Sequence, residues 1–136
     1  FLLTYGDGVS NINISEVVEA HANHSGYMTM TAVQPDGRFG TFDEGEGGKV
    51  NRFLEKPSGD GSWINGGFFV CDPQVFDYID NSDDVVFEQE PLRQLASDGK
   101  LYTYKHNGFW KCMDTLKEKN DLNDMCANGT APWITW

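Results

Sequence analysis

Apolar residues recur along the chain with two different periods, and these periods predict an α/β fold. Continuous or alternating apolar positions predict strands over residues 1–5, 27–33, 38–43, 49–54, 64–72 and 101–106. Helical spacing predicts helices over residues 15–23, 73–78, 88–97 and 115–126, with Ser15 as the cap of the first and Gly99 as the stop of the third. Because strands and helices are interspersed without a strict repeat, we expect one α/β domain with a mixed, mostly parallel sheet flanked by helices.

Asp7 stands between two glycines at the point where the first apolar run ends. Flanking glycines allow a ligand to approach the backbone closely, and in α/β sheets ligands bind beyond the carboxyl ends of strands. A lone carboxylate there suits Mg²⁺, which takes one or two protein carboxylates together with substrate phosphates and water. A plain turn explains the same residues, because Asp-Gly is a common turn pair. Asp114, ahead of the last helix, is either a second metal carboxylate or an ordinary helix N-cap or first-turn acid.

Two further stretches place polar groups on or beside strands. Glu55 and Lys56 follow a strand, where a lysine holds a phosphate as a compact charge and a glutamate accepts hydrogen bonds from sugar hydroxyls. An ordinary solvated pair explains them as well. Asn65, Gly66 and Gly67 lie inside an apolar strand. Two glycines there indicate either the close approach of a hydroxyl-rich ligand or a β-bulge without one.

The histidines are weaker candidates for a site. His21 and His24 are three residues apart on or near the first predicted helix, and with no third ligand type nearby a solvated helix face is favoured over a zinc site. His106 ends a strand just before the Trp110–Asp114 stretch, so a ligand contact is a weaker possibility there. The chain contains no phosphate-binding P-loop, no G-x-G-x-x-G motif and no Ser-His-Asp or Cys-His set.

Charge narrows the range of partners. The chain carries 10 Lys and Arg against 21 Asp and Glu, a net charge of −11. This balance argues against nucleic acids and anionic membranes as partners, and an anionic substrate then needs a metal ion or a local lysine. Three widely spaced cysteines without a C-x-x-C motif are typical of reduced thiols, so we expect a cytoplasmic protein. No apolar run approaches the roughly 20 residues of a membrane span.

Taken in order, several stretches resemble one known family. TYGDGV, GRFGTFD, FLEKPSGDGSWINGGFFV, EPLRQLASDGKL and GFWKCMDTLKEKNDL are similar to the second half of the glucose-1-phosphate cytidylyltransferases, a branch of the sugar-nucleotide pyrophosphorylases. The resemblance covers essentially all 136 residues. It implies a nucleotide-diphospho-sugar transferase-like fold whose N-terminal nucleotide-binding half is missing. Residues 1–136 would then be the part that binds sugar phosphate and metal, and the start of the chain inside an apolar strand agrees with that expectation.

The resemblance also implies a reaction and a set of site residues. CTP and α-D-glucose 1-phosphate would give CDP-glucose and pyrophosphate with Mg²⁺ as cofactor, in nucleotide-sugar synthesis for O-antigen or lipopolysaccharide. Asp7 and Asp114 would hold the metal, and Lys56 would bind the phosphate of the sugar. The further substrate contacts implied are Tyr5, Gly6, Gly40, Glu55, Asn65 and Gly66.

Alternatives remain at the level of function. Base choice would lie in the missing half, so a related enzyme that uses another nucleotide and another sugar 1-phosphate is one alternative. A non-catalytic sugar-binding or regulatory subunit with the same architecture is a second. We expect the isolated chain to be inactive and to expose an unpaired strand edge that favours aggregation. We expect the full-length protein to be a homo-oligomer.

Overall fold

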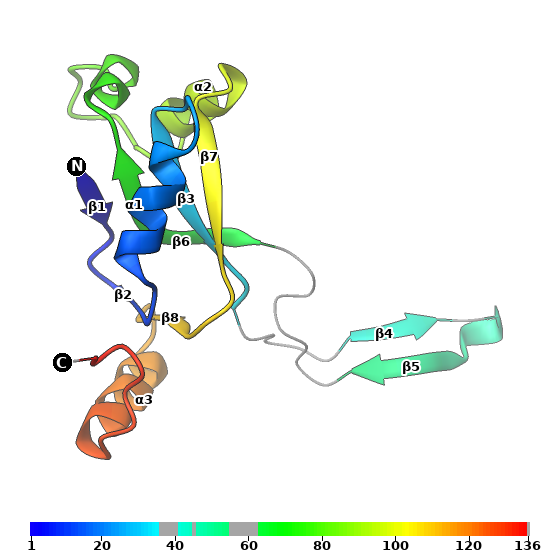
Figure 1. Ribbon diagram of the computed structural model, residues 1–136. Helices are drawn as coiled ribbons and strands as arrows, with labels where there is room; N and C mark the ends of the chain where they lie inside the picture. The colour runs from blue at the N-terminus through cyan, green and yellow to red at the C-terminus, as the bar shows by residue number, and fades with distance from the viewer. Residues whose placement is uncertain (36–40, 45, 55–62, 136) are drawn as a thin grey trace.

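The computed structural model describes residues 1–35, 41–44, 46–54 and 63–135, arranged as in Figure 1. Within them the strands are β1 (Leu2–Thr4), β2 (Gly8–Ser10), β3 (Met28–Val33), β4 (Thr41–Glu44), β5 (Val50–Leu54), β6 (Ile64–Cys71), β7 (Leu101–His106) and β8 (Trp110–Cys112). The α-helices are α1 (Ile14–Ala22), α2 (Glu90–Ser97) and α3 (Leu116–Ala127), and the 3-10 helices are η1 (Glu46–Gly48) and η3 (Pro73–Tyr78). The predicted elements are present with shifted ends, and β2, β8 and η1 are additions to them.

A four-stranded sheet in the order β1-β6-β3-β7 forms the centre of the fold. β6 pairs antiparallel with both β1 and β3, whereas β3 and β7 pair in parallel. The expected mixed sheet is therefore confirmed, but the expected majority of parallel pairings is wrong for these strands. β1, β3 and β7 do run in one direction, and β6 enters between β1 and β3 in the opposite direction.

Helices cover both faces of this sheet. Alternate residues of a strand face opposite sides, so Phe69 and Cys71 of β6 pack with Val75 of η3 and Leu95 of α2 in the main core. Val17 of α1 is buried against the other face, and α1 contacts β3, β6 and β7. β3 is buried along most of its length, as expected for a strand covered on both sides.

Local capping explains where the helices begin and end. Asn13, rather than the expected Ser15, caps α1, because its side chain accepts a hydrogen bond from the Ser15 backbone. Thr115 caps α3 in a capping box with Glu118. Gly99 follows α2 with a φ of 66°, a left-handed conformation that suits glycine, so the predicted stop is confirmed.

The remaining strands form two small sheets. β4 and β5 make an antiparallel hairpin that lies apart from the four-stranded sheet in Figure 1. β2 and β8 form an antiparallel pair close to α3. None of the helices in the described residues is long and apolar enough to cross a membrane.

Candidate functional site

The pairing of β2 with β8 brings the two predicted metal carboxylates into one neighbourhood. Gly8 lies opposite Cys112 in this pair, and the Asp7 carbonyl accepts a hydrogen bond from the Met113 backbone at 2.8 Å. Asp114 is the next residue, so segments from the two ends of the chain meet here. Both aspartates are exposed, which leaves their carboxylates accessible to a ligand.

Cys112, Asp114 and Glu118 each place one possible metal-ligand atom within 4.8 Å of the others. One carboxylate oxygen of Asp114 accepts a hydrogen bond from the Cys112 thiol at 3.3 Å, and the backbone N–H of Asp114 donates to Glu118 at 3.0 Å. Burial, followed by the hydrogen bond with Asp114, raises the pKa of the Cys112 thiol to about 11. The thiol is therefore protonated at neutral pH in the absence of a metal ion. The N-cap interpretation of Asp114 is wrong, because Thr115 fills that position.

The two glycines of β6 form a bulge that is tied to β8. Pairing between β3 and β6 shifts register at this point, and Gly67 has a φ of 77°, so the predicted β-bulge is present. The Trp110 indole N–H donates to the Gly66 carbonyl at 2.8 Å. A Cβ on Gly67 would lie 2.8 Å from the Tyr5 ring, so a side chain there would force the ring or the backbone to shift. Trp110 thus connects the bulge to the strand pair that carries the aspartates.

Asn65 is held in place from both ends of its amide. Its N–H donates to the Tyr5 hydroxyl at 3.0 Å, and its oxygen accepts from the Gly67 backbone at 2.9 Å. Burial, then hydrogen bonding to the Glu88 carboxylate, raises the pKa of Tyr5 to about 12, and the charge of Asp7 acts in the same direction. Tyr5 is therefore a neutral hydroxyl that orients Asn65.

Sequence reasoning did not assign roles to Trp110 or Glu88. Trp110 occurs in one of the stretches that carry the resemblance, but its hydrogen bond to the bulge depends on a pairing between distant segments. Glu88 was placed at the start of a predicted helix, and no local signal relates it to Tyr5. Three predicted residues, Gly40, Glu55 and Lys56, lie outside the described residues.

The three histidines are partly buried, and each is hydrogen-bonded to another part of the protein. The His21 and His24 rings both hydrogen-bond the Thr29 hydroxyl, at 2.8 and 2.6 Å, and the His21 side chain is only 11% exposed. The solvated-face interpretation is therefore wrong for His21. His106 bonds the Asn11 side chain at 3.1 Å and the Phe109 carbonyl at 3.2 Å, so it braces the loop before β8.

Three comparisons place the chain among known proteins. The Nucleotidyl transferase family model matches residues 1–124. The chain is 50% identical to the glucose-1-phosphate cytidylyltransferase of Salmonella typhi over 136 residues, which are 100% of this chain and 52% of that protein. It is 31% identical to the mannose-1-phosphate guanylyltransferase catalytic subunit beta of Xenopus tropicalis over 130 residues, 93% of this chain and 35% of that protein.

A solved structure shows the same fold. It is a putative glucose-1-phosphate thymidylyltransferase from Bacillus anthracis in complex with a sucrose, with a TM-score of 0.62 and 21% identity, covering 99% of this chain and 55% of that one. This chain spans about half the length of the cytidylyltransferase it matches. The resemblance inferred from the sequence motifs is confirmed by these matches. The chain belongs to the nucleotidyl transferase family.

Proposed function

We propose that this chain is the half of a sugar-1-phosphate nucleotidyltransferase that binds the sugar phosphate and the metal ion. The complete enzyme would make CDP-glucose and pyrophosphate from CTP and α-D-glucose 1-phosphate. The observation that supports this most is the pairing of β2 with β8, which joins the segment of Asp7 to that of Asp114. The identity of 50% to a cytidylyltransferase, against 31% to a guanylyltransferase, favours CTP as the nucleotide.

The proposed chemistry asks little covalent work of the protein. An oxygen of the sugar phosphate attacks the α-phosphorus of the nucleotide, and pyrophosphate leaves with the bonding electrons. The protein aligns two anions and offsets their repulsion. Mg²⁺ would supply positive charge at the phosphates, and the exposed carboxylates of Asp7 and Asp114 are the hard oxygen donors it prefers. Lys56 would bind the sugar's phosphate, as the resemblance implies.

Asn65 is suited to a sugar hydroxyl because its amide is only half used. A side-chain amide has two N–H donors and two acceptor lone pairs. One donor is taken by Tyr5 and one lone pair by Gly67. Within the described residues one donor and one lone pair remain, which is what a hydroxyl group needs from a partner. The remaining sugar contacts in the proposal are Gly6, Gly40, Glu55 and Gly66.

The metal assignment can be tested on this chain without turnover. The probe is Mn²⁺. We expect Mn²⁺ to bind to the chain in the presence of glucose 1-phosphate, as measured by calorimetry or electron paramagnetic resonance. Asp7→Asn and Asp114→Asn should each weaken it at least about tenfold, roughly 1.4 kcal/mol. Asp83→Asn, an exposed loop acid, is the control for loss of one charge. Equal losses in all three variants, or none, would contradict the assignment.

Turnover by the complete protein separates the remaining alternatives. Pyrophosphate release should be fastest with CTP among CTP, dTTP, UTP and GTP. A preference for another nucleotide would favour the related-enzyme alternative, and no turnover with any of them would favour the binding subunit.

The proposal also includes a homo-oligomeric complete protein, a cytoplasmic location and a role in surface-polysaccharide synthesis. The three free cysteines agree with a reducing compartment.

A further inference from the structure

Asp114 lies between β8 and α3, where three consecutive backbone N–H groups are hydrogen-bonded. The Met113 N–H donates to the Asp7 carbonyl at 2.8 Å. The N–H groups of Asp114 and Thr115 both donate to Oε2 of Glu118, at 3.0 and 2.9 Å. Because peptide groups are planar, two adjacent ones that are bonded to a single atom fix the φ and ψ angles of the residue between them. Glu118 therefore sets the backbone of Asp114 and the direction in which its side chain leaves the chain.

One of these bonds goes beyond helix capping. In a capping box, the side chain at N3 accepts a hydrogen bond from the N-cap N–H, and the N-cap side chain accepts one from the N–H at N3. Thr115 and Glu118 make both bonds, at 2.9 and 3.2 Å. The bond from Asp114, which precedes the cap, is additional to that pattern. The carboxylate that caps α3 thus also holds the backbone of a proposed metal ligand.

The helix α3 is itself fastened to β8 and its neighbourhood. Lys111 of β8 forms an ion pair with Asp121 of α3 at 2.7 Å. The Phe109 ring, just before β8, stacks on the Trp133 ring, which follows α3, with 5.4 Å between the ring centroids. These two contacts join the segments on either side of Asp114, so a side chain on α3 has a defined position relative to it.

We propose that Glu118 is a positioning residue for metal binding: it holds Asp114 so that its carboxylate can bind Mg²⁺ together with that of Asp7. Mg²⁺ requires nearly ideal octahedral geometry, so a displaced ligand lowers its affinity. Loss of a residue that orients a metal ligand typically lowers metal affinity by about 10- to 100-fold. This inference rests on the proposed function and deepens it.

Direct coordination by Glu118 is the competing interpretation. Its carboxylate belongs to the group of possible ligand atoms with Cys112 and Asp114. Oε2 of Glu118, however, accepts three hydrogen bonds, the third from the Thr115 hydroxyl at 3.0 Å. A carboxylate oxygen has two lone pairs, so these donors use the capacity of this oxygen in full. The bonding therefore favours a supporting role over coordination.

Two substitutions separate the hydrogen bonds of Glu118 from its charge. Glu118→Gln keeps the length of the side chain and an acceptor oxygen that capping boxes also use, but it removes the charge. Glu118→Asp keeps the charge but is one methylene shorter, so it no longer reaches the Asp114 N–H. With Mn²⁺ as the probe in the presence of glucose 1-phosphate, we expect Glu118→Asp to weaken binding at least about tenfold. Glu118→Gln should remain within about threefold of the native chain, because a partly exposed charge contributes little.

Glu16→Ala is the matched control in another helix. Glu16 is the first-turn acid of α1 and accepts hydrogen bonds from the cap residue Asn13 at 2.9 Å and from the Tyr104 hydroxyl at 2.6 Å. Its loss should lower the free energy of unfolding in urea and leave Mn²⁺ binding unchanged. Amide hydrogen exchange gives a readout without any ligand, since the Asp114 N–H should exchange faster in Glu118→Asp and not in Glu16→Ala.

Three results would overturn the inference. The first is the same Mn²⁺ affinity in Glu118→Asp as in the native chain. The second is a loss in Glu118→Gln as large as that in Glu118→Asp, because charge or direct coordination would then explain the effect. The third is an equal loss in Glu16→Ala, which would point to general stability. A native chain that binds no Mn²⁺ with glucose 1-phosphate would instead contradict the proposed function, and the inference with it.

Discussion

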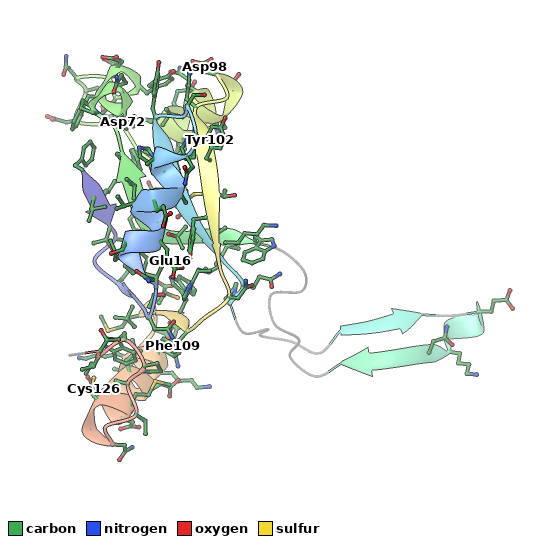
Figure 2. The ribbon with its side chains drawn as sticks, in the orientation of Figure 1. Glu16, Asp72, Asp98, Tyr102, Phe109 and Cys126 are labelled. Carbon is green, nitrogen blue, oxygen red and sulfur yellow. The ribbon has the colours of Figure 1, made fainter. Side chains whose placement is uncertain are left out.

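Polar side chains from distant segments gather at two places, toward opposite ends of the four-stranded sheet. One is the histidine cluster, formed by His21, His24, Thr29 and Asp72. The other is the aspartate site, formed by Asp7, Asn65, Trp110 and Asp114. In Figure 2 the labels Asp72 and Tyr102 mark the first end, and Phe109, next to β8, marks the second. The two clusters differ in how many of their hydrogen-bonding groups remain available.

In the histidine cluster the hydrogen bonds indicate which nitrogen of the neutral His24 ring carries the proton. The Gly26 N–H donates to Nδ1 of His24 at 3.0 Å, so Nε2 carries the ring proton and donates to the Thr29 hydroxyl at 2.6 Å. The same hydroxyl is hydrogen-bonded to Nδ1 of His21 at 2.8 Å, and Nε2 of His21 lies 3.4 Å from the Asp72 carboxylate. Each of these ring nitrogens has a partner inside the protein.

In the aspartate site, some carboxylate and amide groups are accessible to a ligand. Asp7 and Asp114 are exposed, and Asn65 keeps one donor and one lone pair unused by Tyr5 and Gly67. Convergence of polar residues is common to both places. What distinguishes a candidate ligand site is hydrogen-bonding capacity that the protein's own contacts do not consume. The histidine cluster should therefore respond to substitution through stability, and the aspartate site through ligand binding.

The largest stability effect is expected from Thr29→Val. Thr29 is 1% exposed, and its loss would leave a ring nitrogen of His21 and one of His24 without a partner. At about 1–3 kcal/mol for each such group, the free energy of unfolding should fall by about 2 kcal/mol or more in urea titrations. Mn²⁺ binding by the folded variant should not change.

Thr31→Val is the matched control for that experiment. Thr31 is equally buried on the same strand, but within the described residues its hydroxyl has no hydrogen-bond partner. Replacing an unpaired buried hydroxyl by a methyl group should leave stability unchanged or raise it. Equal losses for both threonines would show that the histidine cluster is not held by its hydrogen bonds.

Gly66→Ala should have an intermediate effect and should act on both properties. A Cβ there would lie 2.9 Å from Val33 Cγ1 and 3.1 Å from the Thr31 carbonyl. We expect a loss of about 1–3 kcal/mol in thermal or urea unfolding, together with weaker glucose 1-phosphate binding as the bulge shifts. In Gly6→Ala, where nothing lies within 4 Å, stability should be retained and only ligand binding should weaken. A loss of stability in Gly6→Ala without one in Gly66→Ala would contradict this prediction.

The smallest effect is expected from acid titration of His24. Burial, then the neighbouring His21, lowers the pKa of His24 below its usual value of 6.5, and Asp72 opposes this. The unfolded chain therefore takes up the proton first as the pH falls. The contribution to stability is complete above the usual pKa and is lost as the pH falls below it. Urea unfolding across this range should show a steeper acid loss in the native chain than in His24→Gln, and equal slopes would contradict the prediction.

Local chemistry explains which features were predictable. The bulge at Gly66–Gly67 and the stop at Gly99 depend on glycine's own backbone freedom, and the predicted cap at Ser15 was displaced only to Asn13. The two aspartates are predicted as ligand groups because each follows or precedes an element end, and the structure shows only that their segments meet. The direction of β6 was not predictable, since it is set by pairing with β1 and β3 rather than by its own residues.

The sequence by itself determined the elements, the family and the candidate ligand groups, because propensity, capping and motif order act over a few neighbouring residues. Only the tertiary structure decided which of those groups meet. The register of β2 with β8 places Asp7 beside Met113, and the Trp110 bond to Gly66 joins that pair to the bulge. The packing of α1 against β3 partly encloses His21, whose ring contacts Thr29 and Asp72 although it looks solvated in the sequence. Such contacts depend on the burial and hydrogen-bond satisfaction of the whole chain, which no short window of sequence contains.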